Sequence, residues 1–120
     1  MEHKIRYVDE YQLLHQQIIG EYSTEQAREF GKKYKVLLEG KPFKQLIVDL
    51  REAGKMENRE TRSMTNEMLN QAGFTQVAFV GANAATRMIA KVLMKLGSLE
   101  AESNFLKDIE SAVEWLKSRR

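Results

Sequence analysis

Hydrophobic positions along the chain follow two periodicities, one typical of strands and one typical of helices. Short apolar runs occur at Leu46–Val48 and Val77–Val80, and each predicts a buried strand. A polar or glycine-containing stretch follows each run, and an amphipathic helix comes next, beginning near Asn58 and near Ala84. Repetition of strand, loop and helix is typical of α/β proteins with a mainly parallel sheet.

The residues before the first of these runs predict a β-hairpin. Lys4–Val8 and Leu13–Tyr22 have strand-like patterns, and Asp9–Glu10 forms the expected turn between them. We expect the second strand to lie at an edge of the sheet, because the polar pair Gln16 and Gln17 interrupts its apolar positions. The hairpin then adds an antiparallel strand to the parallel sheet.

Helix start and stop signals complete the predicted order of elements. A capping box at Ser23–Gln26 begins the first helix, and Gly40 with Pro42 ends it. A short strand is expected at Asn104–Leu106, and Asp108 caps the last helix. The prediction is a single α/β domain over residues 1–120, with the order ββαβαβαβα and helices flanking a mixed, mainly parallel sheet.

The amino-acid composition of the chain excludes several classes of function. The chain has no cysteine, so disulfides, thiolate catalysis and thiolate metal sites are excluded. A net charge of +2 gives no reason to expect nucleic-acid binding. No apolar run approaches the roughly 20 residues that span a bilayer, and no signal-peptide core follows the first residues. We therefore expect a soluble cytoplasmic protein, with peripheral membrane contact left open.

Catalytic and metal-binding patterns are not found in the sequence. His3 and His15 are the only histidines, and neither has a second ligand at metal spacing. No serine lies in a nucleophile elbow with histidine and aspartate partners. We expect no metal, no cofactor and no enzymatic activity.

Several short strings, spread over nearly the whole chain, carry a family resemblance. They are Ile19–Glu25, Leu46–Leu50, Ala78–Gly81, Phe105–Asp108 and Ala112–Leu116. Their order and spacing resemble the STAS domain, and especially its SpoIIAA-like branch of anti-sigma factor antagonists. The resemblance implies a regulatory module that binds a protein partner without catalysis.

One position departs from the family pattern. In STAS domains of the antagonist type, a kinase phosphorylates a serine that follows an aspartate just before the second helix. Asp49 matches the aspartate that ends the central strand, but Glu57 and Asn58 stand where the aspartate–serine pair is expected. Thr61 falls on the apolar stripe of the helix, and Ser63 is expected to be exposed one turn into it. We therefore predict no phosphorylation at Asn58.

The resemblance places a recognition loop at residues 51–58, before the second helix. The candidate partner-binding or ligand-binding residues are Asp49, Gly54, Lys55, Met56, Glu57, Asn58, Arg62, Gly81, Asn83 and Arg87. Simpler interpretations stay open: a solvated loop, an Asp49 carboxylate that accepts loop amides, and a plain turn in which Asn83 caps the third helix.

The third predicted helix carries a basic stripe beside its apolar face. Its candidate membrane-facing residues are Met88, Lys91, Met94 and Lys95. Such a helix can lie on an anionic membrane, although the same pattern describes the solvent face of a packed helix. The resemblance adds an alternative function, because some SpoIIAA-like proteins have been proposed to bind nonpolar ligands or membrane surfaces. The partner is thus a protein or a nonpolar small molecule, and homodimer formation is left open.

Overall fold

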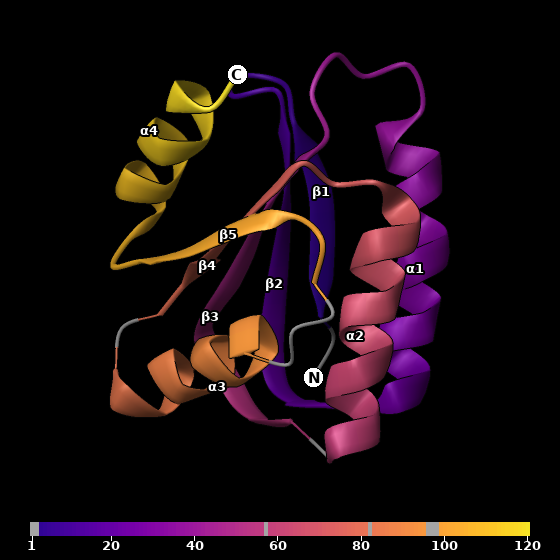
Figure 1. The fold of residues 1–120 in the computed structure, drawn as a ribbon, viewed down its shortest axis with the longest axis vertical. Helices are drawn as coiled ribbons and strands as arrows, with labels where there is room; N and C mark the ends of the chain where they lie inside the picture. Colours follow the sequence, from indigo (N-terminus) through magenta and orange to yellow (C-terminus); the bar gives the residue numbers. More distant parts are fainter. Residues whose placement is uncertain (1–2, 57, 82, 96–98) are drawn as a thin grey trace.

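A five-stranded sheet forms the centre of the protein (Figure 1). The computed structural model describes residues 3–56, 58–81, 83–95 and 99–120. The strands are β1 (Lys4–Val8), β2 (Leu13–Tyr22), β3 (Gln45–Met56), β4 (Gln76–Val80) and β5 (Glu102–Leu106). They lie side by side in chain order, with β1 antiparallel to β2 and all other neighbours parallel. The predicted fold class and element order are confirmed.

Helices cover both faces of the sheet. They are α1 (Thr24–Leu38), α2 (Arg59–Ala72), α3 (Ala84–Lys95) and α4 (Ile109–Ser118). Because right-handed crossovers join parallel strands laid down in one direction, α1, α2 and α3 fall on the same face. They enclose the larger apolar core, and α4 covers a smaller core on the opposite face (Figure 1). Among the described residues, no helix is long and apolar enough to cross a membrane.

The predicted helix ends are confirmed in atomic detail. The Ser23 hydroxyl accepts from the Gln26 amide at 3.2 Å, and the Gln26 side chain accepts from the Ser23 amide at 2.8 Å. Asn58 Oδ1 accepts from the Thr61 amide at 2.9 Å at the start of α2. Gly73 ends that helix at φ 78°, a left-handed conformation that glycine adopts without a Cβ clash.

The position of β2 corrects the prediction of an edge strand. β2 pairs with β1 on one side and with β3 on the other, so β1 is the edge. Gln16 is 1% exposed, and its side chain lies between the hydroxyls of Tyr22 and Tyr34, to which it is hydrogen-bonded. A buried glutamine is tolerated in a central strand when its amide is satisfied in this way. The polar pair therefore marks an internal hydrogen-bond network.

The extent of β3 corrects the prediction of a recognition loop. β3 continues beyond Asp49 to Met56, and its distal half pairs with β2 through Ile19↔Glu52 and Gly20↔Ala53. Residues 51–56 are therefore strand, and Glu57 lies outside the described residues. The polar sequence of this extension resembles a loop. Only one edge of the extension, the one facing β2, pairs with another described strand. A similar extension at β5 moves its start from the predicted Asn104 to Glu102.

A close approach of two glycine backbones shapes the extension of β3. A Cβ placed on Gly54 would lie 3.0 Å from the carbonyl carbon of Gly20, a distance that real Cβ atoms rarely show. Gly20 itself has φ +71°, where side chains are strained. The two glycines let β2 and β3 remain paired through an irregular register.

Candidate functional site

An apolar groove lies where α3 passes the end of β3 and the start of α2. It has a volume of about 450 Å³ and is lined by Ala53, Gly54, Arg62, Ala85, Met88, Ile89 and Val92. β3 supplies the first two residues, α2 supplies the arginine and α3 supplies the rest. We call these seven residues the apolar groove. Met88 is 67% exposed at its rim.

Arg62 brings a charged group into the groove. The side chain is half-buried, and its Nε is buried with no hydrogen-bond partner among the described residues. A buried donor without a partner costs free energy, and this donor belongs to a residue in the wall of the groove.

A second hollow adjoins the groove on the other side of α3. It has a volume of about 640 Å³ and is lined by Gly81, Asn83, Ala84, Arg87, Met88, Lys91 and Lys107. We call these residues the basic hollow. It lies at the start of α3, where the helix dipole favours anions. Both hollows share Met88 and therefore form one continuous surface, which we call the recognition surface.

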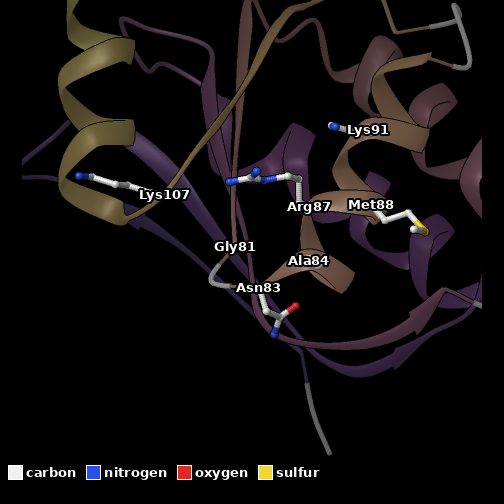
Figure 2. A pocket seen from close by; sticks show the side chains of 7 residues that line it. All are labelled: Gly81, Asn83, Ala84, Arg87, Met88, Lys91 and Lys107. Atoms are coloured by element: carbon white, nitrogen blue, oxygen red, sulfur yellow. The ribbon is translucent and has the colours of Figure 1, made fainter.

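Side-chain directions separate the two parts of this surface. In Figure 2, Arg87 and Met88 leave α3 in different directions, so one helix presents a cation and an apolar side chain to neighbouring hollows. The Arg87 guanidinium lies 5.3 Å from the centre of the Phe105 ring, which orients it through a cation–π contact. Lys107 follows the end of β5 and adds a second element to the basic hollow. None of the described lining residues of the two hollows is acidic.

Asp49 lies apart from the recognition surface. Its carboxylate is fully buried on β3, where it accepts from Arg51 Nη2 at 2.7 Å, Arg51 Nε at 2.9 Å and His15 Nε2 at 3.1 Å. Burial alone would raise the pKa of Asp49, but the hydrogen bonds from His15 and Arg51 outweigh it and hold the pKa well below its usual range. Asp49 also accepts from the Arg51 amide at 3.1 Å. Its charge is thus engaged inside the protein.

The structure brings together seven of the residues proposed from the sequence and leaves others apart. Those that line the recognition surface are Gly54, Arg62, Gly81, Asn83, Arg87 and, from the membrane-facing set, Met88 and Lys91. Asn58 is an exposed helix cap, and Met94 is half-buried against the larger core. The side chains of Lys55, Met56 and Lys95 lie outside the described residues, as does Glu57.

Three other residues of the surface are not among the candidates proposed from the sequence: Ile89, Val92 and Lys107. Ala53 falls within the proposed segment 51–58, and Ala84 and Ala85 lie between the proposed residues Asn83 and Arg87. Lys107 had a usable signal, because it directly follows β5, and parallel neighbouring strands end at the same edge of a sheet. Ile89 and Val92 had none, because the groove beside them depends on how α3 passes β3 and α2.

The two hydroxyl residues near the expected phosphorylation position occur where the sequence predicted. Thr61 is fully buried, and its hydroxyl lies 2.7 Å from that of Thr24, with Asn58 Oδ1 at 3.3 Å. Ser63 is exposed on α2. Thr61 therefore joins α1 to α2, and a kinase could not reach it in the folded protein.

Comparison with known proteins gives a family and a fold. A family model described as "Domain of unknown function (DUF7793)" matches residues 14–120. An uncharacterized DUF3478-family protein with a SpoIIAA-like fold, from Shewanella loihica PV-4, superposes with a TM-score of 0.68 at 17% identity, over 96% of this chain and 92% of that one. The anti-sigma factor antagonist SpoIIAA in its unphosphorylated form gives 0.62 at 9% identity, over 97% and 98%. No curated protein matches the sequence significantly. The SpoIIAA-like fold implied by the sequence is therefore confirmed.

Proposed function

The chain belongs to the DUF7793 family of domains of unknown function, and we propose that it is a non-catalytic regulatory module that binds a protein through the recognition surface. The proposal agrees in kind with the partner binding implied by the SpoIIAA-like resemblance. Because Asn58 replaces the expected phosphorylated serine and serves as the cap of α2, we propose that binding does not depend on a phosphate at this position.

The exposure of Met88 is the observation that carries the proposal. It is a large apolar side chain, 67% exposed, at the junction of an apolar groove and a basic hollow. A single exposed apolar side chain is common, but Met88 adjoins the aliphatic residues of the groove, and an apolar patch rimmed by polar groups marks an interaction site. Methionine suits such a site because its flexible thioether adapts to the partner.

The charges of the surface support binding rather than catalysis. The charged residues among its described lining residues are Arg62, Arg87, Lys91 and Lys107, and none of the described lining residues is a carboxylate or a histidine. The buried carboxylate of Asp49 is paired with Arg51 and His15 elsewhere. A general acid and base are therefore not supplied by the described residues of this surface.

Substitution of Met88 by aspartate tests the proposal. We expect Met88→Asp to reduce recovery of the partner about tenfold or more, which corresponds to about 1.4 kcal/mol, because a carboxylate would have to be buried at the contact. Val36→Asp is the matched control, since Val36 on α1 is also a large exposed apolar residue, at 72%. Quantitative affinity purification from the native cells compares both variants with the wild type. Equal recovery with all three chains would contradict the proposal.

A second candidate is a carrier of a nonpolar small molecule with peripheral membrane contact. The apolar groove favours it, because its lining is largely aliphatic. Carrier pockets, however, enclose roughly 70–90% of a ligand's surface, whereas Met88 at this rim is itself mostly exposed. We therefore place the carrier second. A native mass spectrum of the protein from its own cells would support it through a bound mass of a few hundred daltons (roughly the size of a drug or fatty acid).

A further inference from the structure

We infer that the partner presents an amphipathic helix with acidic side chains, whose apolar ridge enters the apolar groove while its carboxylates face the basic hollow. The inference rests on the proposed function and names the chemistry of the partner. It follows from the shape of the groove, from its charges and from the way the two hollows are joined.

The shape of the groove fits a helix better than an extended strand or an enclosed molecule. One wall is the helix α3, the opposite wall includes Arg62 of α2, and residues 53–54 of β3 lie between them. Helix-in-groove recognition uses a row of apolar side chains at positions i, i+3, i+4 and i+7. A volume of about 450 Å³ that opens to solvent along α3 accepts a few such side chains while the rest of the helix stays outside.

An added strand is less compatible with this site. β-augmentation uses a free edge of a sheet. The pairs between β3 and β4 end at Asp49↔Val80, so residues 51–56 pair with β2 on one edge only. Five of the seven residues that line the groove, however, belong to α2 and α3. The groove therefore offers mainly side chains of helices to a partner.

The positive charges of the lining residues predict that the partner is negatively charged where it makes contact. Arg87, Lys91 and Lys107 gather in the basic hollow, and Arg62 adds a cation to the wall of the apolar groove. Because none of the described lining residues is acidic, these cations have no carboxylate in the same hollows to neutralise them. Glutamate or aspartate of a partner would supply the acceptors, and charge complementarity of this kind also speeds association.

Met88 lies where the apolar groove meets the basic hollow, so it determines how the apolar and acidic side chains of the partner must be arranged. Met88 belongs to both hollows, and Arg87 and Met88 diverge from adjacent positions of α3 (Figure 2). A partner helix must therefore carry its acidic side chains directly beside its apolar ridge. Nucleic acid would satisfy the cations but leave the aliphatic lining of the groove uncovered.

A pair of synthetic peptides tests the inference. The first is a helix-stabilised peptide of about 18 residues with leucine at i, i+3, i+4 and i+7 and glutamate flanking that row. The second is identical except that lysine replaces every glutamate. Binding to the full chain is measured by calorimetry, and the contact is mapped by NMR shifts of backbone amides. We expect the glutamate peptide to bind about tenfold or more tightly than the lysine peptide, with shifts centred on α3.

Charge-reversed variants make the test specific to this surface. Arg87→Glu with Lys91→Glu is expected to reverse the preference between the two peptides. Lys32→Glu with Lys35→Glu is the matched control, because both lysines are exposed on α1 and outside the lining of the recognition surface. This control changes the net charge by the same amount and should leave the preference intact.

Three outcomes would overturn the inference: equal binding of both peptides, shifts centred on another element, or no binding of either peptide. If partner recovery is nevertheless lost in Met88→Asp, the proposed function stands and only the partner's chemistry is wrong. If partner recovery is unchanged in Met88→Asp, the proposed function itself fails.

Discussion

Replacement of Asp49 by asparagine is expected to lower the free energy of unfolding by about 2–3 kcal/mol at neutral pH. The Asp49 carboxylate is fully buried and accepts hydrogen bonds from both Arg51 and His15. An asparagine amide fills the same space, but it removes the charge and turns an NH₂ group toward these donors. Chemical denaturation of the two proteins, with circular dichroism as the readout, measures the loss.

The pH dependence of this stability loss distinguishes the effect of the Asp49 charge from an effect of packing alone. Since the pKa of Asp49 is lowered in the folded protein, its stabilisation is present above the unfolded-state pKa of about 3.9 and is lost as the pH falls below that value. The difference between wild type and Asp49→Asn should therefore shrink under acid conditions. Asp9→Asn is the control, because it removes a carboxylate of the same kind from the exposed turn between β1 and β2, where little loss of stability is expected. A constant difference at every pH would contradict the assignment.

Replacement of Gln16 by leucine is expected to cost about 2–4 kcal/mol, although it removes a polar residue from the core. The Gln16 amide satisfies two tyrosine hydroxyls at once, donating to Tyr22 and accepting from Tyr34. Burial raises the pKa of Tyr34 well above its usual range, so the hydroxyl cannot escape the loss of its acceptor by ionising. Leucine leaves both buried hydroxyls without this partner. Equilibrium unfolding in urea measures the effect.

Two further variants distinguish the network from a general effect of the substitution. Gln17→Leu is the neighbouring control; Gln17 is half-buried and its side chain bonds to the exposed Glu52, so a change near zero is expected. In a Tyr34→Phe background, Gln16→Leu should cost less, because one of the two orphaned hydroxyls is gone. Equal costs in both backgrounds would show that Gln16 does not act through Tyr34.

Helix boundaries could be predicted from the sequence because they depend on local chemistry. The side chains of Ser23, Asn58 and Asp108 each bond to an amide three residues away, so a few consecutive residues contain the whole signal. Gly73 provides an equally local stop at positive φ. The alternation of strands and helices then determines the fold class.

Strand pairing could not be predicted in the same way, because it joins residues far apart in the chain. The distal half of β3 is held by pairs such as Ile19↔Glu52, and its polar residues resemble a loop when only the local pattern is considered. Gln16 was assigned to an edge strand for the same reason, since its partner Tyr34 lies on another element. Both errors are cases in which tertiary contacts override local pattern.

The candidate site was predicted in part for a similar reason. Arg87 and Lys91 were identified because they recur on one face of a helix, and Gly54 because it punctuates a polar segment. The groove itself needs α3 to cross the end of β3 beside Arg62, which no local pattern specifies. Asp49 was proposed as a binding residue because of its place at the end of a strand. In the structure its carboxylate is instead paired with His15 and Arg51 inside the protein.

Site-specific photo-crosslinking in the native cells shows directly whether a protein contacts the recognition surface. A photoreactive amino acid is placed at position 88 in one chain and at position 36 in another, since both sites are exposed in the folded protein. The account predicts a discrete covalent adduct with a protein from position 88, its loss when Arg87→Glu is added, and no matching adduct from position 36. Absence of a protein adduct from position 88, or the same adduct from both positions, would contradict it.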